Sequence, residues 1–181
     1  MPEKKSSFTS AKTFIFVIIL CGVCALVLSI MAESLKGPQK RAAELYRSKQ
    51  LLLAAQLLSY DGTLDGASKK ATDREILSVF ETRIVSRLTD AQGNLYTFEQ
   101  AGINENAYLT DNAKLGFSHL PYKLIYVVKQ SNESPTPYGY VIPVNGYGLW
   151  DAIYGYLGVA SNGDTVLGMT WYEQKETPGL G

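Results

Sequence analysis

The sequence has no surplus of charge of either sign, because 17 Lys and Arg residues are matched by 17 Asp and Glu residues in 181. A nucleic-acid-binding domain normally carries a basic excess, so this balance argues against that class. The chain has only two cysteines, which excludes a small fold built on a disulfide framework. Hydrophobic residues make up 46% of the chain and aromatic residues 11%, which excludes an intrinsically disordered chain.

The chain also lacks the residue patterns of common catalytic and metal sites. His119 is the only histidine, and Pro121 follows it in a loop-like segment, so we expect it to have no functional role. No Ser-His-Asp arrangement, metal cage or phosphate-binding G-x-x-x-x-G-K-[ST] loop is present. Gly146-Tyr147-Gly148 does not begin a G-x-G-x-x-G motif, because Asp151 takes the place of its last glycine, and we expect a tight turn there. The sequence therefore predicts no catalytic residue and no metal ligand.

One hydrophobic run stands out, at residues 13–32, which contain no charge and lie between Lys12 and Glu33. A helix of this length rises about 30 Å, the thickness of the hydrocarbon core of a bilayer. A cleavable signal peptide is the competing interpretation, but its apolar core is shorter and ends in small residues, whereas Ile30 stands near the end of this run. We predict a tail over residues 1–12 and one retained transmembrane helix over residues 13–32.

The charges beside this run leave its orientation open. More basic residues follow the run closely than precede it, and a strict count favours a cytoplasmic C-terminal domain. Long domains cross the membrane largely regardless of charge, which weakens that count. Cys21 and Cys24 share one face of the predicted helix, and we interpret them as small apolar residues that pack against lipid or a neighbouring helix. Thiolates that bind a metal together with another protein of a complex are the alternative.

Residues 33–92 are predicted to form a helical stalk. Gly37-Pro38 is expected to break the membrane helix, and residues 39–58 are rich in good helix formers. Thr72-Asp73-Arg74-Glu75 matches a capping box, which marks the start of a further helix. The apolar face of that helix is expected to consist of Ile76, Leu77, Val79, Phe80, Ile84 and Leu88.

The sequence changes character near Gly93, where short runs rich in aromatic and β-branched residues begin. Residues 93–138 are predicted to be a mixed α/β region, and residues 139–181 the start of a separate domain. The strand-like runs are 95–98, 124–128, 138–144, 150–160 and 165–173. Asn162-Gly163 between the last two runs predicts a β-hairpin, whose second arm is expected to be buried on both faces. The fold class is therefore α+β, with mostly antiparallel strands.

The last six residues are Glu176, Thr177, Pro178, Gly179, Leu180 and Gly181. Proline fixes φ and glycine permits positive φ, so this segment is expected to form a defined loop. From the residues alone, an ordinary surface turn is the favoured interpretation. A loop whose backbone binds a planar or anionic ligand is the alternative.

Several segments together resemble the C subunit of the bacterial sodium-translocating NADH:quinone reductase. They are residues 141–150, Tyr154-Gly155, residues 161–166, Tyr172-Glu173 and residues 176–181. The resemblance implies one N-terminal membrane helix and an FMN-binding domain on the periplasmic side of the bacterial inner membrane. It also implies that Glu176, Thr177, Pro178, Gly179, Leu180 and Gly181 are cofactor-binding residues beside the flavin, where Glu176 would tune the flavin potential.

In that family FMN is attached through its phosphate to a threonine of an S-G-A-T-type sequence, which follows the E-T-P-G-L-G loop. This chain contains no such threonine. The nearest match, residues 61–68, lies on the wrong side of the domain, and Asp65 replaces the expected Ser or Thr. We therefore expect the chain to be an N-terminal portion of the family, with an incomplete FMN-binding domain.

The function implied by the resemblance is that of an FMN-carrying electron-transfer subunit, inactive alone, in a sodium-pumping NADH:quinone reductase. Its partners would be the other membrane subunits and the lipid bilayer, with NADH and quinone reached through the complex. One alternative is a membrane-anchored structural or assembly module without redox function, because the attachment threonine is missing. Another is the homologous subunit of an Rnf-type electron-transfer complex, which also carries E-T-P-G-L-G.

Overall fold

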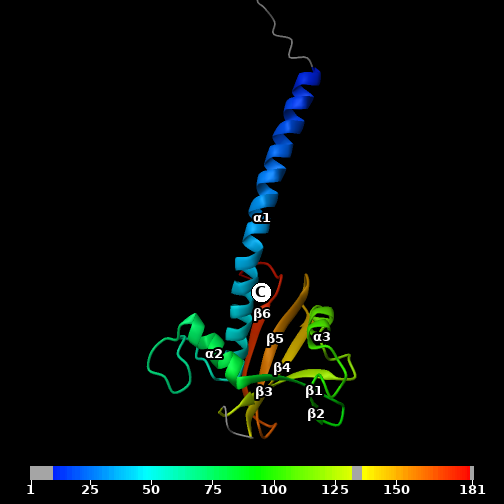
Figure 1. The fold of residues 1–181 in the computed structure, drawn as a ribbon. Coiled ribbons are helices and arrows are strands. Elements are labelled where there is room, and N and C mark those ends of the chain that lie inside the picture. Colours follow the sequence, from blue (N-terminus) through cyan, green and yellow to red (C-terminus); the bar gives the residue numbers. More distant parts are fainter. Residues whose placement is uncertain (1–9, 132–135, 180–181) are drawn as a thin grey trace, which may run out of the picture. The chain divides into compact units, whose positions relative to one another are not determined.

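The computed structural model describes residues 10–131 and 136–179 of the chain (Figure 1). These residues fall into two compact units, Met1–Ala43 and Glu44–Gly181. Helix α1 (Ser10–Ala54) begins in the first unit and ends in the second. Each unit is described by itself below.

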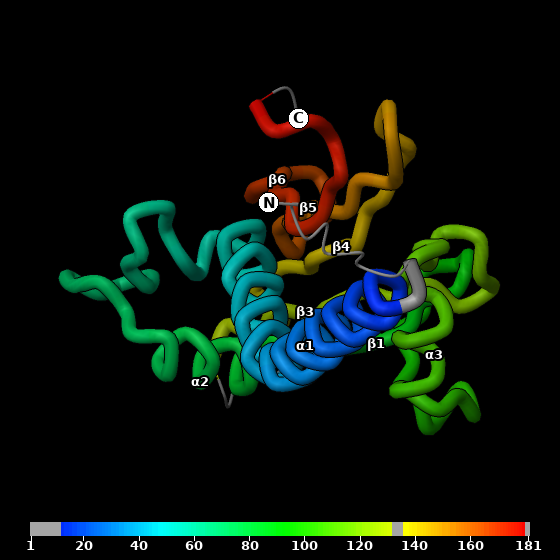
Figure 2. Tube along the Cα trace, turned by 90° about the horizontal axis from the view of Figure 1, so that it is seen from above, coloured from blue at the N-terminus to red at the C-terminus, as the bar shows by residue number. Residues whose placement is uncertain are grey.

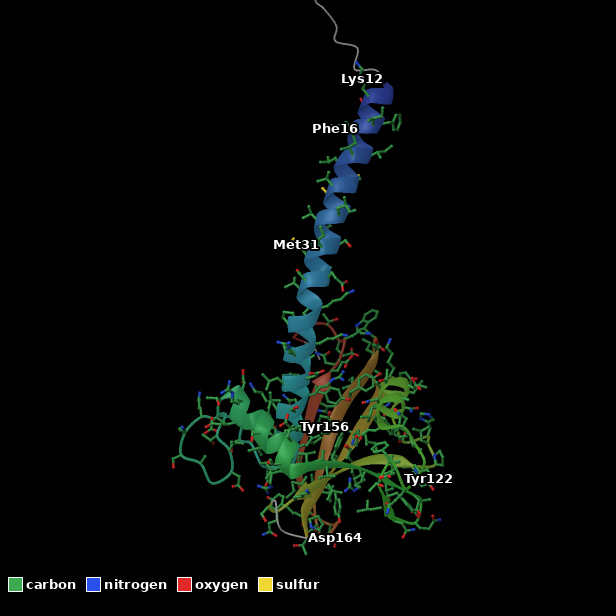
Figure 3. The ribbon with its side chains drawn as sticks, viewed as in Figure 1. Lys12, Phe16, Met31, Tyr122, Tyr156 and Asp164 are labelled. Atoms are coloured by element: carbon green, nitrogen blue, oxygen red, sulfur yellow. The ribbon has the colours of Figure 1, made fainter. Side chains whose placement is uncertain are left out.

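In the first unit, α1 carries the hydrophobic run. Its apolar side chains project outward without covering one another, as Phe16 and Met31 do at 62% and 56% exposure (Figure 3). The helix is long and apolar enough to cross a membrane, with a mean hydropathy of 3.1 in its most apolar window. Cys21 and Cys24 are exposed free thiols on this helix. In length and composition, this part of α1 suits a transmembrane anchor.

The expected break at Gly37-Pro38 is wrong, because Pro38 lies inside the continuous helix α1. A proline inside a helix removes one backbone donor and costs about 3 kcal/mol. The segment after Pro38 is rich in Ala, Leu, Lys, Arg and Gln, which favour helix and offset this local cost. Gly37 has open space around it, so the neighbouring turn meets no steric obstacle.

The second unit contains a six-stranded antiparallel sheet in the order β2-β1-β3-β4-β5-β6 (Figure 1). The prediction of an α+β fold with mostly antiparallel strands is thereby confirmed. The strands are β1 (Ile84–Thr89), β2 (Leu95–Tyr96), β3 (Lys123–Lys129), β4 (Pro137–Tyr147), β5 (Ala152–Ala160) and β6 (Val166–Glu173). Two short helices, α2 (Asp73–Arg83) and α3 (Glu105–Asn112), complete the unit.

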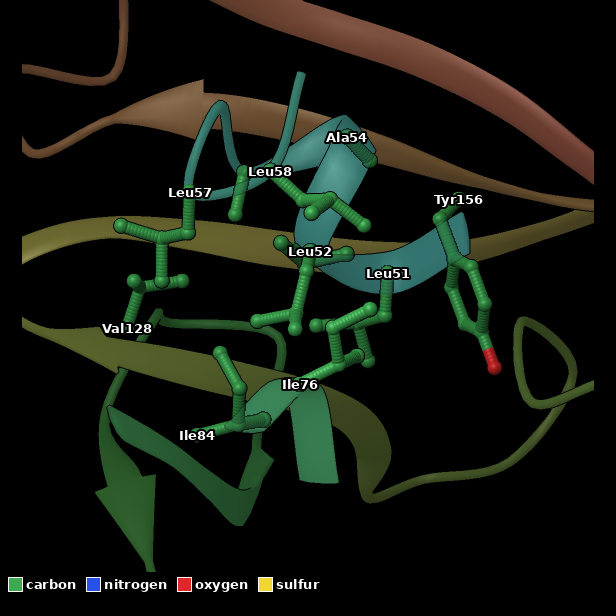
Figure 4. Packing of buried hydrophobic residues seen from close by; sticks show 11 residues of the cluster. Leu51, Leu52, Ala54, Leu57, Leu58, Ile76, Ile84, Val128 and Tyr156 are labelled. Atoms are coloured by element: carbon green, nitrogen blue, oxygen red, sulfur yellow. The ribbon is translucent and has the colours of Figure 1, made fainter. Parts of the chain in front are cut away.

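The helices of this unit cover one face of the sheet, called here the inner face. The last turns of α1 and the start of α2 bring Leu51, Leu52 and Ile76 against Val128 of β3 (Figure 4). A second cluster packs α3 against β1 and β3 through Tyr108, Leu88 and Leu124. Leu88, Leu124 and Val128 lie on the same side of their paired strands, so α1, α2 and α3 share this face (Figure 2).

The end of α1 touches the sheet where two strand residues are glycines. A Cβ atom at Gly158 of β5 would lie 1.9 Å from the carbonyl oxygen of Ala54, and one at Gly168 of β6 would lie 3.1 Å from it. The hydroxyl of Thr170 donates to the carbonyl oxygen of Gln50 at 2.8 Å and ties β6 to the same helix. The missing side chains therefore let the helix end rest directly on β5 and β6.

The capping box at the start of α2 is confirmed. The Thr72 hydroxyl accepts from the backbone N–H of Glu75 at 3.3 Å, and the Glu75 carboxylate accepts from the backbone N–H of Thr72 at 2.7 Å. The predicted extent of this helix is wrong, because Ile84 and Leu88 lie in β1. Residues four apart share a face in a helix and also in a strand, so their spacing does not separate the two. Pairing of β1 with β3 decides in favour of the strand.

The hairpin predicted at Asn162-Gly163 is confirmed, since β5 and β6 pair antiparallel around it. Gly163 has φ of 78°, and the Asn162 side chain accepts from the amides of Asp164 and Thr165 at 3.1 and 3.3 Å. The expectation that β6 is buried on both faces is wrong, because Thr170 is its one buried residue. This strand lies at the edge of the sheet, and only one of its faces is covered by α1.

We predict that Gly158→Ala destabilises the second unit, because its methyl group cannot share space with the backbone of Ala54. Overpacking a core typically costs about 1–3 kcal/mol, and an immobile backbone neighbour places this case at the upper end. Urea unfolding of the chain in detergent, followed by near-UV circular dichroism, measures the loss. Gly146→Ala in β4 is the matched control, since a Cβ there meets nothing within 4 Å. Equal stability of the two variants would refute the close contact.

Candidate functional site

A pocket of about 760 Å³ lies where the tip of the β4–β5 hairpin meets the end of β6. This volume lies within the range of small-molecule sites. Aromatic side chains and carboxylates contribute most of its lining, which comprises Tyr46, Gly146, Tyr147, Ile153, Trp171, Tyr172, Glu173, Gln174 and Glu176. Every lining residue belongs to the second unit.

Trp171 supplies a flat aromatic wall. A Cβ atom at Gly155 would lie 2.6 Å from Cε3 and 3.0 Å from Cζ3 of its indole, so the ring packs directly over the bare backbone of β5. The side chain is nevertheless 49% exposed, which leaves aromatic surface free beside Ile153. Sequence reasoning missed Trp171 as a site residue. The available signal was Gly155 inside a strand, since such a glycine often marks the close approach of another group.

Glu176 is held at the tip of the hairpin. Its Oε1 accepts from the backbone N–H of Trp150 at 3.2 Å. The same oxygen would lie 2.1 Å from a Cβ atom at Gly148, so only glycine leaves room for the carboxylate there. The backbone N–H of Glu176 donates to the side-chain oxygen of Gln174 at 2.6 Å. These contacts fix a carboxylate at one edge of the pocket.

An ion pair supports the same segment. Lys175 pairs with Asp151 in the loop between β4 and β5. Its hydrogen bond holds the pKa of the Asp151 carboxyl below the usual value, and the same bond raises the pKa of Lys175. That loop is closed by the backbone N–H of Gly148, which donates to the carbonyl oxygen of Asp151 at 2.8 Å. The tight turn expected at Gly146-Tyr147-Gly148 lies later in the chain, because Gly146 and Tyr147 belong to β4 and the turn runs from Gly148 to Asp151. Consecutive residues after β6 are thus tied to one hairpin.

Tyr172 and Arg47 form the wall between the pocket and the core. Tyr172 stacks on Tyr156, with 4.7 Å between ring centroids, and the guanidinium of Arg47 lies 5.2 Å from the centre of the Tyr172 ring. Arg47 also donates to Glu173 at 2.7 Å. Burial raises the pKa values of Tyr156 and Tyr172, so both phenols stay neutral at physiological pH. The Arg47–Glu173 pair places no net charge on this wall.

The predicted site residues are only partly described. Glu176 lines the pocket, and Thr177 and Pro178 follow it as exposed residues. Gly179 has φ of 86°, the conformation for which glycine is suited. Leu180 and Gly181 lie outside the described residues. Within residues 10–131 and 136–179, no group of three or more His, Cys, Asp or Glu side chains is placed to hold a metal ion.

Comparison with known proteins shows that part of this pocket belongs to a recognised domain family. Residues 148–181 match the FMN-binding domain family. The C subunit of the Na(+)-translocating NADH-quinone reductase of Chlamydia muridarum is 32% identical over 203 residues, which cover 92% of this chain and 64% of that protein. The protein of the same name from Yersinia pestis is 29% identical, over 99% of this chain and 68% of that protein.

A solved structure has the same fold. The crystal structure of the C subunit of the Na(+)-translocating NADH-quinone reductase from Parabacteroides distasonis aligns with a TM-score of 0.51 at 20% sequence identity. The alignment covers 81% of this chain and 61% of that one. The chain thus spans a little less than two thirds, 64%, of the length of the Chlamydia muridarum relative. The match to the FMN-binding family includes Gly148, Trp171 and Glu176, which build the pocket.

Proposed function

Because the chain is homologous to the C subunits of the Na(+)-translocating NADH-quinone reductases over 92% of its length, we propose that it is an FMN-carrying electron-transfer subunit of such a reductase. One observation carries the proposal: most residues that line the pocket, Trp171 and Glu176 among them, lie within the segment that matches the FMN-binding family. That coincidence favours a redox role over a purely structural module.

The pocket residues fit the flavin ring. The ring is flat and largely apolar, and Tyr46 and Trp171 offer aromatic surface inside a pocket of about 760 Å³. The edge of the ring carries hydrogen-bonding groups, for which Gln174 and Glu176 supply an amide and a carboxylate. We therefore assign the ring of FMN to this pocket.

Bound FMN supplies the chemistry, which is the acceptance and release of electrons. The chain orients the ring and sets its surroundings. Trp171 is held over Gly155 and presents a stacking surface, while Tyr46 and Tyr172 limit the access of water. Glu176 places a carboxylate at the edge of the pocket, where it disfavours further negative charge. Glu173 exerts less of this effect, because Arg47 pairs with it.

The segment from Glu176 to Gly181 is proposed to supply the cofactor-binding residues named from the sequence. Support comes from the position of Glu176 in the pocket and from the turn at Pro178 and Gly179. Thr177 connects these two features. Leu180 and Gly181 complete the proposed segment on the strength of the sequence resemblance alone.

The proposal extends to partners and location. The other membrane subunits of the reductase are the proposed partners, with NADH and quinone reached through the complex. We assign the chain to the bacterial inner membrane, with one span at residues 13–32 and the second unit on the periplasmic side. Support for the membrane span and the partners comes from the one apolar helix found among the described residues and from the relatives being named as subunits of a reductase. The periplasmic side rests on the sequence resemblance alone.

FMN is expected to bind the full chain in nanodiscs and to quench the fluorescence of Trp171 in a Trp150→Phe background. Trp171→Ala should weaken FMN binding roughly tenfold, since aromatic stacking contributes about 0.5–1.5 kcal/mol beyond the burial of area. The affinity of each variant for FMN is measured by a titration followed by flavin fluorescence. Tyr60→Ala is the control, because Tyr60 is 87% exposed and does not line the pocket. Equal affinities of the Trp171 and Tyr60 variants would rule out this pocket as the ring site.

Glu176→Gln should raise the midpoint potential of bound FMN, because it removes a negative charge from the edge of the ring. We expect a rise of roughly 30–60 mV, where 59 mV corresponds to about 1.4 kcal/mol for one electron. Gly148→Ala should shift the potential the same way, since its methyl group displaces the carboxylate. Glu99→Gln, at an exposed position outside the pocket, is the charge-matched control. An unchanged potential in Glu176→Gln would end this assignment.

The periplasmic placement is checked by labelling in intact cells. Asp164 lies in the exposed β5–β6 turn (Figure 3), so a cysteine at this position is accessible in the folded unit. Asp164→Cys, combined with Cys21→Ala and Cys24→Ala, should react with a membrane-impermeant maleimide that reaches the periplasm. Labelling that occurs only after the inner membrane is opened would place the unit in the cytoplasm instead.

A further inference from the structure

The three helices leave a second pocket open on the inner face of the sheet, which we call the helix-side pocket. It encloses about 410 Å³, which lies near the lower end of the range for small-molecule sites. Side chains of α1, α2 and α3 line it together with Tyr126 of β3, Pro143 of β4 and Tyr156 of β5. All of its lining residues belong to the second unit.

Two buried hydroxyl groups face this pocket without a partner. Ser48 of α1 is 7% exposed and Tyr156 is 6% exposed, and neither hydroxyl forms a hydrogen bond with a residue that the structure describes. No completely buried side-chain oxygen or nitrogen in this part of the chain lacks a partner, so both hydroxyls reach the open space of the pocket. Figure 4 shows the Tyr156 hydroxyl pointing away from the leucine cluster. Buried hydroxyls of this kind call for a bound partner.

Tyr126 adds a third hydroxyl to the lining. Its ring meets the ring of Tyr156 edge to face, with 6.1 Å between centroids, and its hydroxyl also lacks a hydrogen bond within the described residues. Burial raises the pKa values of Tyr126 and Tyr156, so both phenols keep their protons at physiological pH and can donate them in hydrogen bonds. The pocket therefore offers neutral donors, which suit an uncharged acceptor such as a carbonyl oxygen.

The charges around the pocket also favour an uncharged ligand. Glu44 and Glu81 line it as exposed residues, and neither forms an ion pair with a described residue, so they disfavour an anion. Arg47 is paired with Glu173, and its charge acts on both buried phenols, so it disfavours a cation beside their hydroxyls.

Aromatic rings form much of the remaining wall. Phe80 of α2 and Phe117, which follows α3, line the pocket together with Tyr126, Tyr156 and Tyr172. Aromatic side chains favour a further ring in stacked or edge-to-face contact. The body of the ligand is therefore expected to be an aromatic ring, and the volume limits it to a small molecule.

We propose that the helix-side pocket binds a small uncharged aromatic compound that carries a carbonyl group. Its ring lies among the aromatic side chains, and its oxygen accepts hydrogen bonds from Tyr156 and Ser48. The site is separate from the candidate flavin pocket, although Tyr172 contributes to the lining of both. The proposal does not require that FMN binds, because it rests on the pocket, its unpartnered hydroxyls and the charges around it.

Acetophenone is the probe, and ethylbenzene, which has a methylene group in place of the carbonyl, is its matched control. The full chain in nanodiscs carries 3-fluorotyrosine at position 126, whose fluorine NMR signal reports on the pocket. Acetophenone should shift this signal saturably and bind several-fold more tightly than ethylbenzene, compared at equal free concentrations in water. The same label at position 60, which is 87% exposed, should show no saturable shift.

Tyr156→Phe should weaken the binding of acetophenone roughly two- to tenfold, the factor that one neutral hydrogen bond contributes, and leave that of ethylbenzene unchanged. Ala113→Phe should abolish the saturable shift with both compounds, because its ring fills the pocket. Ala113 is exposed and has helical φ and ψ, so the larger side chain is compatible with folding. Ala67→Phe, at an exposed position that does not line this pocket, is the matched control.

Near-UV circular dichroism verifies that each variant is folded before affinities are compared. Three results would overturn the proposal: no saturable shift with acetophenone, equal weakening of both compounds by Tyr156→Phe, or tighter binding of benzoate or benzylamine than of acetophenone. FMN titration of the same chain separates this proposal from the flavin assignment. A chain that binds FMN but not acetophenone refutes the helix-side site alone, whereas acetophenone binding without FMN affinity refutes only the flavin assignment.

Discussion

The rest of the second unit depends on the contact between the end of α1 and the sheet. The carbonyl oxygen of Ala54 occupies the space that a side chain at Gly158 would fill, so strand and helix meet backbone to backbone. This contact fixes the distance between the sheet and the preceding turns of α1, where Leu51 and Leu52 enter the core. Tyr46 reaches the pocket from the same turns. A shift of the helix end would therefore move the core and the pocket wall together.

Two glycines, which have no side chain, also shape the pocket. At Gly155 the absent Cβ leaves room for the indole of Trp171, and at Gly148 it leaves room for the carboxylate of Glu176. In both places a functional group packs on bare backbone, which reduces its freedom to move. An aromatic surface and a negative charge are thus held on neighbouring parts of one hairpin, which is the preorganisation that a planar redox cofactor needs.

Features that depend on residues close together in the sequence could be predicted, whereas contacts between different strands could not. The capping box at Thr72 and the turn at Asn162-Gly163 each depend on residues within one short segment, so their patterns predict them. The spacing of Ile84 and Leu88 fits a helix and a strand equally, and only pairing with β3 decides. Pro38 does not end α1, because the residues around it favour helix. The packing of Trp171 over Gly155 depends on strand register, which no local pattern in either strand encodes.

The two faces of the sheet differ in what they contact. The inner face has its partners in the helices, so its apolar residues stabilise the unit by themselves. On the other side of the sheet Ile142, Val166 and Met169 remain exposed. Trp171 lies on this second side and lines the pocket, with one side of its ring on Gly155. The ring of Trp171 is thus positioned by the register of β5 and β6, whereas Tyr46 of the same pocket is positioned by the helix that builds the core.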